Sequence, residues 1–555
     1  MRPSPRLALW LVLLGFAALL LAQGVCTQED AFISFRYARN LVDGHGLVFN
    51  PGERVEGYTN FLWTVLLAGV MALGGDPVPW SRGLGAAAAL ALLLLAGRRA
   101  ARDGGPAAGV LAVALAASVP GLAAEAVQGL ETVPFALLVA AGAWAWQDAC
   151  RAWRTAAGDA AAPDAALVAA PAAGRSAARF AVPAALFLWL AALTRPEGLG
   201  AAGLCWLGCL AATRGAPPAV RRAVRRGATA VLAAVLLLYL PYWLWRFHYY
   251  GDLLPNTFYA KATGGSLPVI VGHGLAYLGR FLAGQPVLAV ALAGGALLAR
   301  RARRRAADGA REMAAAAAPV PWLLAGYAAY VVLVGGDFKE TFRFLLPLVA
   351  PAAVLAAPPL ARWWTAAPAR RRWTGAAVLL AAAVNLAPLL RPTVRWSRQR
   401  ALDLRRRTAC GAWLRDHVRP DAVLAIHSVG IVPYVSGLTT IDMWGLNDRH
   451  IARLPMVRGG RGRRPGHAKQ DDRYVLDRRP DLYVPFAWQM VTADPHGPPL
   501  DVWFPDLPDW RERQRHWRVV SAPLPPDPAD PLRPRWFHFL LRRDSDALLS
   551  GSPPR

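Results

Sequence analysis

The sequence predicts a polytopic α-helical membrane protein with about eleven transmembrane helices and a C-terminal α/β domain outside the membrane. Three observations predict it: 55% of the 555 residues are hydrophobic, only 18% are charged, and long apolar runs recur through positions 1–390. Soluble proteins carry about 25% charged residues, so this apolar excess calls for a lipid environment. The composition excludes a small disulfide-stapled domain and an intrinsically disordered chain.

Eleven apolar runs approach the length that crosses a bilayer, about 17 to 25 residues. They are 7–25, 83–97, 107–124, 133–147, 180–193, 198–213, 228–245, 282–299, 314–334, 344–361 and 374–390. A further apolar segment, 61–74, is too short to span, and we expect it to lie along the outer surface. Because 391–555 contains no such run, we divide the chain into 1–390 and 391–555.

The formal charge of +26 sets the expected orientation. A basic chain invites a nucleic-acid interpretation, but these basic residues are scattered, so we expect no nucleic-acid partner. Loops on the N-terminal side hold more than twice as many Lys and Arg as the loops opposite. Because basic loops stay in the cytoplasm, we expect the N-terminus inside and the C-terminal domain outside. The first run also resembles a cleavable signal peptide, and this alternative stays open.

The outer domain alternates helical and extended patterns. The sequence predicts a helix over 400–418, strands at 422–427 and 439–442, a helix near 474–478, and strands at 482–484, 518–521 and 536–541. This alternation is typical of a compact α/β or α+β unit.

The first external loop, 26–82, is the densest in polar side chains. It begins with Glu29-Asp30 and continues through further acids, aromatic residues and asparagines. Adjacent carboxylates repel, which raises a pKa or creates a cation site, and either result suits a general base. The alternative is a solvated helix end, but so many polar groups in one loop favour a functional site.

Five segments of the chain resemble a known family. The stretch EDAFISFRYARNLVDGHGLVFNPGERVEGYTNFLW resembles the first external loop of GT-C glycosyltransferases that use polyprenyl-phosphate sugars. More narrowly, it is similar to terminal arabinofuranosyltransferases of cell-wall synthesis, which use decaprenyl-phosphate arabinose. The other segments that fit the pattern are 193–198, 250–257, 335–344, and 442–448 with 465–467.

The resemblance implies a multi-pass GT-C enzyme of the bacterial inner (plasma) membrane. It implies transfer of a sugar, arabinofuranose in the narrower comparison, from a polyprenyl-phosphate carrier to a glycan or glycoconjugate outside. The family places a catalytic carboxylate at the start of the first loop, usually in an Asp-Asp pair. This chain has Glu29-Asp30, so we take Asp30 as the principal acid and Glu29 as its partner, with their roles open to exchange. Whether both hold a divalent cation, Mg or Mn, also stays open.

Further site residues follow from the chemistry of a lipid-phosphate donor. Its phosphate lies at the outer interface and needs cations, since Arg binds phosphate in a fork and Lys as a point charge. We expect Arg195, Lys261 and Arg343 to supply them. An ion pair with Glu197 is the alternative for Arg195, and interfacial snorkelling is the alternative for Arg343. The residues expected to position substrates are His45, Glu56, Tyr58, Asn60, Asp337, Asp442 and His467.

Several other functions are weighed against this one. The sequence has no Walker loop, no GxGxxG after a strand and no HExxH, the usual signatures of nucleotide-driven transport and zinc proteolysis. A flippase or transporter of lipid-linked sugars would show internal repeats, and none is visible. A non-catalytic assembly protein would not explain the acidic cluster. A GT-C enzyme that glycosylates lipid A or protein differs only in its acceptor.

Overall fold

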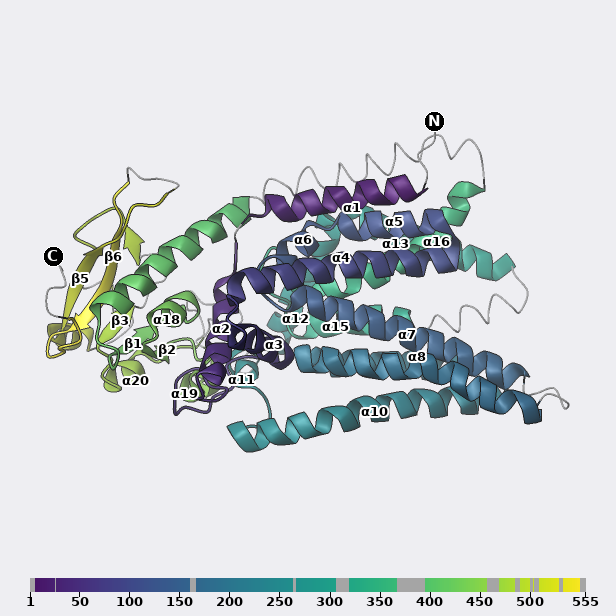
Figure 1. Ribbon diagram of the computed structural model, residues 1–555, viewed down its shortest axis with the longest axis horizontal. Coiled ribbons are helices and arrows are strands. Elements are labelled where there is room, and N and C mark those ends of the chain that lie inside the picture. Colours follow the sequence, from purple (N-terminus) through teal and green to yellow (C-terminus); the bar gives the residue numbers. More distant parts are fainter. Residues whose placement is uncertain are drawn as a thin grey trace.

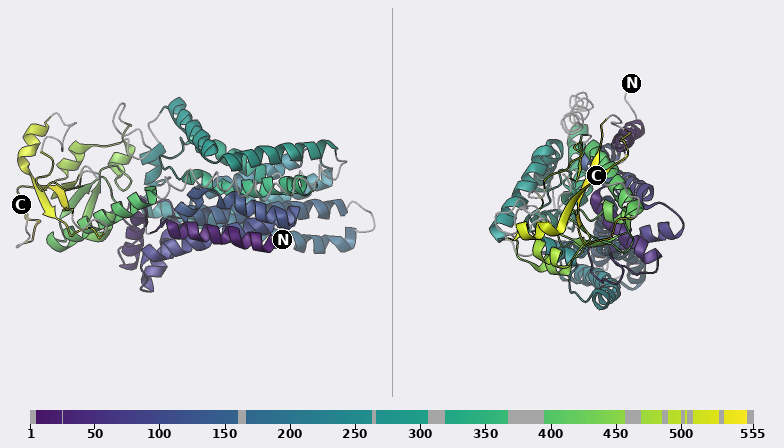
Figure 2. Two further views of the ribbon diagram at one scale, coloured as in Figure 1. Left: turned by 90° about the horizontal axis from the view of Figure 1, so that it is seen from above. Right: turned by 90° about the vertical axis from the view of Figure 1, so that its left-hand side faces the viewer.

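The computed structural model describes residues 5–549, except 25, 160–165, 263–265, 306–318, 367–394, 457–468, 485–489, 500–502, 504–508 and 529–532. Long helices form a bundle, and a mixed β-sheet with its own helices forms a second part (Figure 1). Figure 2 shows that the two parts lie end to end. Helix α1 begins at the bundle end far from the sheet. We call the end that carries the sheet the outer end, and we call the second part the sheet domain.

Six helices in the described ranges are long and apolar enough to cross a membrane, or seven if a bent pair counts as one span. The six are α1 (Pro5–Ala22), α4 (Pro77–Gly104), the 177–194 part of α8 (Ala166–Thr194), α10 (Pro218–Tyr250), α12 (Leu267–Gly284), and α16 (Leu346–Thr365) with η1 (Arg343–Leu345). The bent pair is α5 (Pro106–Ala117) and α6 (Pro120–Ala126), which meet at 69°. The bundle also contains α7 (Thr132–Asp159), α9 (Glu197–Ala212), α13 (Pro286–Arg305) and α15 (Pro319–Leu333).

The predicted apolar runs agree with these helices. Each of the first ten runs coincides with one of the helices or with the bent pair, and the eleventh, 374–390, lies outside the described residues. The number of eleven spans therefore stays a prediction. Proline stands in the first turn of α4, α5, α6, α12 and α16, where its missing N–H costs no helical bond.

Small residues let the bundle helices approach closely. Gly85 of α4 lies against the carbonyl of Ala126, and Gly104 lies against Pro358 of α16. A side chain at either glycine would meet the backbone of its neighbour. Small residues at such contacts are typical of helices packed within a membrane.

Four shorter or peripheral helices gather at the outer end: α2 (Glu29–Val42), α3 (Phe61–Ala72), α11 (Asn256–Ala262) and α12 (Figure 1). Helix α3 has 12 residues, fewer than the roughly 20 that a span requires, and it lies beside α2. That 61–74 lies along the membrane surface stays a prediction. Gly274 and Tyr277 of α12 contact Val332 and Gly336 respectively, at and beyond the end of α15. We therefore place α12 along the outer end of the bundle.

The sheet domain is built on six strands in the order β2-β1-β3-β6-β4, with β5 paired to β6. β1 (Val423–Ile426) lies parallel between β2 (Thr439–Asp442) and β3 (Leu482–Val484). β6 (Trp536–Arg542) runs antiparallel to β3, β4 (Val491–Thr492) and β5 (Trp517–Pro523). The accompanying helices are 395–417, α18 (Ile431–Ser436), α19 (Arg449–Arg453), α20 (Asp472–Asp477), α21 (Trp510–Arg513) and η3 (Gln514–His516).

Both faces of the sheet are covered. Phe537 and Phe539 of β6 belong to one buried apolar cluster, while Leu540 belongs to another, as the alternation of side chains along a strand requires. Every predicted strand of this domain is present. The short β4, α18 and α19 were not predicted.

The sheet domain is fastened to α2. Arg36 of α2 donates to the backbone carbonyls of Pro433 and Leu438 at 2.7 and 2.8 Å. The rings of Phe32 and Tyr434 meet edge to face at 5.4 Å. Because Arg36 is 5% exposed, these bonds are shielded from water, and the domain and α2 form one packed unit.

Candidate active site

Helix α2 starts at the two acids that open the first external loop. Glu29 and Asp30 form its first turn, where the positive end of the helix dipole favours negative side chains. The side chain of Asp30 is 41% exposed. It is therefore open to a ligand although it stands among buried groups.

Cations from the loop after α15 surround Asp30. The Lys339 ammonium donates to the Asp30 carboxylate at 2.7 Å, and an Arg343 nitrogen lies 3.8 Å from the same oxygen. Arg343 is also bonded to Asp337. The side chains of Lys339 and Asp337 are 2% and 5% exposed, so they line the wall of the site, whereas Asp30 faces its opening.

Lys261 of α11 supplies a third cation. It is exposed and forms no ion pair with any residue that the structure describes, yet its charge acts on Asp30. The sheet domain holds α11 in place: Asn256 donates to three backbone carbonyls there, and Lys469 donates to the Tyr259 carbonyl at 2.8 Å. We call Lys261, Lys339 and Arg343 the cation cluster.

The charges of this region act on one another strongly. Burial by itself would raise the pKa of Asp30, but the cation cluster outweighs burial and holds that pKa well below its usual range. The pKa of Asp337 is lowered in the same way, mainly by Arg343. Burial and then the charge of Arg343 lower the pKa of Lys339. Among the described residues, the three cations of the cluster face two carboxylates, Asp30 and Asp337. This group of side chains therefore carries a net positive charge that a bound anion would neutralise.

Arg195 lies beside the cluster but is already paired. Its guanidinium donates to Glu131 at 2.7 Å and to Glu197 at 2.8 Å. The ring of Phe344 lies 5.4 Å from the guanidinium carbons of both Arg195 and Arg343. The ion pair with Glu197 that we considered as an alternative is present, so Arg195 has less free charge to offer than the cluster has.

Asn60 connects α2 to this ion pair. Its amide donates to Glu131 at 2.8 Å, and its oxygen accepts from Ser34 and Thr64 at 3.1 and 3.2 Å. Asn60 thus orients the acid that holds Arg195.

Glu29 turns toward the sheet domain and not toward the cluster. Its carboxylate accepts the N–H groups of Gly430 and Ile431 at 2.8 and 3.2 Å and lies 2.8 Å from Arg407. Asp30, by contrast, takes its partners from the bundle. The two neighbouring acids share no partner among these contacts.

Three other candidates of the first loop lie away from the first turn of α2. Glu56 is 3% exposed and pairs with Arg246 of α10; burial raises the pKa of Glu56 to about 7, against the lowering by Arg246. The Tyr58 hydroxyl lies 3.2 Å from that of Tyr250. His45 is exposed beyond the far end of α2, a helix roughly 20 Å long.

Asp442 is enclosed within the sheet domain. It is 1% exposed and accepts the N–H groups of Trp444, Gly445 and Asn447 at 2.9, 3.1 and 2.7 Å. Burial raises the pKa of Asp442 to about 6, while these donors lower it. Asp442 therefore shapes a turn and does not reach the cluster. His467 lies outside the described residues.

The described residues contain no group of three or more His, Cys, Asp or Glu side chains arranged to hold a metal ion. Glu29 and Asp30 turn to different partners, so they do not fit a divalent cation held between them. The Mg or Mn ion considered above thus gains no support from this geometry.

Sequence reasoning missed Lys339, Gln28 and Glu131. Lys339 also donates to the Gln28 side chain, and Glu131 holds Arg195. A signal for Lys339 was available: only three of the 62 basic residues are lysines. Two of the three lie near Asp30.

Two sequence comparisons bear on this chain. Residues 395–539 match a family model described as a domain of unknown function (DUF8728). A stretch of 65 residues is 43% identical to a terminal beta-(1->2)-arabinofuranosyltransferase of Mycobacterium tuberculosis. That match covers 11% of this chain, and the chain spans about a tenth of the length of that relative.

The chain is also similar to solved structures. ArnT from Cupriavidus metallidurans, bound to undecaprenyl phosphate, superposes with a TM-score of 0.51 at 13% identity, over 79% of this chain and 85% of ArnT. The oligosaccharyltransferase of Archaeoglobus fulgidus in its apo form gives a TM-score of 0.49 at 14% identity, over 78% of this chain and 64% of its own length. The superposition on ArnT confirms the predicted fold: this chain has the GT-C fold of a polytopic membrane protein, with a C-terminal sheet domain.

Proposed function

We propose that this protein is an integral membrane glycosyltransferase that takes its sugar from a polyprenyl-phosphate carrier. The observation that carries the proposal is an open carboxylate, Asp30, bordered by the three cations of the cation cluster. The crystal structure of ArnT with undecaprenyl phosphate supports a carrier of this kind. The short likeness to an arabinofuranosyltransferase supports arabinofuranose as the sugar. We further propose a glycan or glycoconjugate acceptor on the outer face of a bacterial plasma membrane.

In the proposed transfer reaction the cation cluster and Asp30 have different roles. The bond between the anomeric carbon and the phosphate oxygen breaks, and its electron pair stays on the phosphate. The acceptor oxygen bonds to the anomeric carbon and loses its proton. The cation cluster stabilises the phosphate as it departs, and the ionised Asp30 stabilises positive charge that develops on the sugar.

Binding of the phosphate also prepares Asp30. Lys339 and Arg343 are held by Asp30 and Asp337, and a phosphate competes for the same cations. Once the phosphate has taken them, the pKa of Asp30 rises because less positive charge acts on it. Asp30 can then receive the proton of the acceptor hydroxyl.

The test is consumption of the donor by the full-length protein. We would incubate purified protein in lipid nanodiscs with a panel of radiolabelled polyprenyl-phosphate sugars and an acceptor fraction, and separate the products by chromatography. The expected result is free polyprenyl phosphate together with labelled acceptor, and the panel identifies the sugar. A folded protein that leaves every donor intact would overturn the proposal, and movement of intact donor across vesicles would indicate a transporter.

A further inference from the structure

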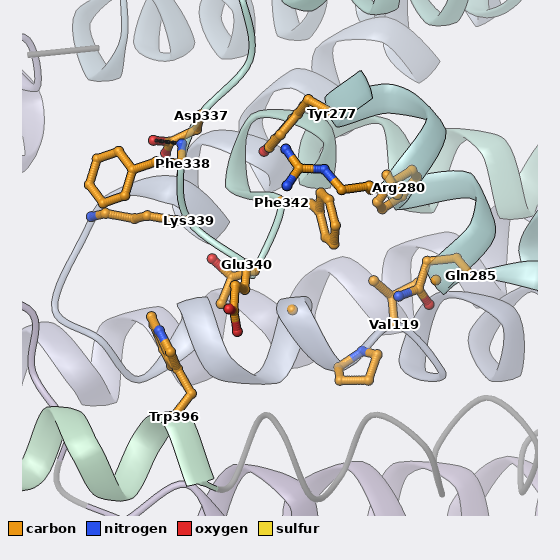
Figure 3. Close-up of a pocket in the computed structure, with 15 residues that line it drawn as sticks. Val119, Tyr277, Arg280, Gln285, Asp337, Phe338, Lys339, Glu340, Phe342 and Trp396 are labelled. Carbon is orange, nitrogen blue, oxygen red and sulfur yellow. Dashed lines mark hydrogen bonds between the residues drawn. The ribbon is translucent and has the colours of Figure 1, made fainter. Parts of the chain in front are cut away.

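A cavity of about 350 Å³ is lined in part by Lys339, one member of the cation cluster (Figure 3). Its lining comes from the loop after α15, the C-terminal half of α12 with Gln285 after it, the start of α6, and Trp396 of the 395–417 helix. Asp337 lines it as well. The cavity therefore shares a wall with the proposed active site, and this volume falls within the range of small-ligand pockets.

A buried polar atom of this cavity has no hydrogen-bond partner among the described residues. Gln285 is 4% exposed, and its side-chain oxygen has no hydrogen-bond partner in the described part of the chain. Arg280 and Glu340 also line the cavity; both are exposed, and neither forms an ion pair with a described residue. The Arg280 Nε donates to the Ala276 carbonyl at 3.3 Å, which leaves its other nitrogens open to a ligand. In Figure 3 Glu340 stands on the side of Trp396, and Arg280 and Gln285 stand opposite. A buried oxygen without a donor costs about 1 to 3 kcal/mol, which a ligand with hydroxyl groups would recover.

The charge of the cavity differs from that of the cation cluster. Among the described residues of the lining, Arg280 is an unpaired cation and Glu340 is an unpaired acid, so their charges cancel. Lys339 and Asp337 are already paired, with Asp30 and Arg343 respectively. A second phosphate would therefore find no surplus of positive charge here. Aromatic rings, Phe342 and Trp396 among them, offer an apolar surface beside these polar groups.

We infer that this cavity binds a neutral sugar ring. Sugar hydroxyls both donate and accept, so they match an acid, a guanidinium and an amide oxygen together, while the C–H face of the ring packs on the aromatic side chains. The inference rests on the proposed function and adds a binding site to it. The ring belongs either to the acceptor or to the donor, and the chemistry of recognition is the same for both.

The test is a kinetic comparison of Glu340→Gln and Gln285→Leu with the wild-type protein. Three constants are measured: the KM for an acceptor probe, octyl diarabinofuranoside; the KM for the sugar-bearing donor; and the inhibition constant of sugar-free polyprenyl phosphate. The matched control is Glu512→Gln, since Glu512 is an exposed residue of α21 in the sheet domain.

We expect one of the two KM values to rise about tenfold in each cavity variant, and the one that rises identifies the source of the ring. The inhibition constant of the sugar-free carrier should change less than twofold. If both KM values stay within twofold, or if that inhibition constant rises as much as a KM does, the cavity does not bind a sugar ring.

A failure of the proposed function would look different. In that case the wild-type protein consumes no donor at all. The cavity is then tested by direct calorimetric binding of a panel of octyl disaccharides that includes octyl diarabinofuranoside. Binding that Glu340→Gln weakens about tenfold supports the inference, and absence of binding to the wild-type protein overturns it.

Discussion

Two groups of carboxylates at the outer end differ in what surrounds them. Asp30 is open, and the cation cluster lowers its pKa. Glu56 and Asp442 are closed, with 3% and 1% of their surface exposed, and burial raises their pKa to about 7 and about 6. Each closed acid has its partners within the protein: Arg246 for Glu56, and the backbone N–H groups of a turn for Asp442. The open acid faces more positive charge than it can neutralise.

This difference distinguishes acids that stabilise the fold from an acid that is accessible to a ligand. Glu56 joins the first external loop to α10 through Arg246, and Asp442 closes a turn beside Asn447. Removing either should cost stability. Asp30 joins α2 to the loop after α15, but its side chain can reach a substrate. Removing it should cost activity.

The largest expected effect is the loss of transfer in Asp30→Asn. The amide keeps the shape of the side chain but removes the charge that faces the reacting sugar, so we expect a fall of about 10³-fold or more in the rate. Consumption of radiolabelled polyprenyl-phosphate sugar measures it. The unfolding temperature in detergent should fall less than in Glu56→Gln, because Lys339, whose pKa is already lowered, can lose its proton, whereas Arg246 cannot. A variant that keeps more than a tenth of the wild-type rate would contradict the role of Asp30.

The second effect is a loss of stability in Glu56→Gln. At about pH 9 the Glu56 carboxylate is ionised, since its pKa is about 7 in the folded protein, and the substitution then leaves the Arg246 charge buried without its partner, which costs about 3 to 5 kcal/mol. Urea-induced unfolding of the detergent-solubilised protein, followed by tryptophan fluorescence, measures the change in unfolding free energy. Glu53→Gln is the matched control, because the Glu53 pair with Arg478 is exposed and worth less than about 1 kcal/mol. Equal losses of unfolding free energy in Glu56→Gln and Glu53→Gln would contradict the idea that burial makes Glu56 a stabilising acid.

The fold followed from the sequence further than the site did. Apolar runs located the bundle helices other than α12, because each helix must satisfy its own backbone hydrogen bonds in lipid, and alternation located the strands from Val423 to Arg542. Helix α12 was not predicted, since its glycines together with His273 and Arg280 interrupt the apolar run.

The site was harder to predict because its geometry depends on contacts distant in sequence. The acids Glu29 and Asp30 were found together, but which of them faces the substrate depends on Gly430 and Arg407, about 400 positions later. Glu56 and Tyr58 matched the family motif as well as Glu29 and Asp30 did. In the structure both are buried against α10, where they contact Arg246 and Tyr250. Burial of this kind cannot be read from spacing.

The third effect is a pH dependence of stability from Asp442. Its pKa is 3.8 when free and about 6 in the folded protein, so between these values the native state binds more protons than the unfolded state does. The unfolding free energy therefore falls as pH rises from about 4 to about 6, by at most about 3 kcal/mol. Asp442→Asn should remove this part of the decline. Unfolding in urea at pH 4, 5, 6 and 7 checks it, and parallel profiles for the two proteins would exclude the assignment.

The smallest effect concerns Lys261, the cation without a protein partner among the described residues. Its substitution Lys261→Met removes one charge-assisted contact to the donor phosphate, worth about 1.5 kcal/mol at the low end, so the KM for the donor should rise about tenfold. Lys261→Arg keeps the charge and should recover most of the affinity. Neither change should lower the unfolding temperature, since the side chain is exposed. A donor KM that stays within twofold in Lys261→Met would show that Lys261 does not bind the phosphate. The phosphate site would then consist of Lys339 and Arg343, which follow α15.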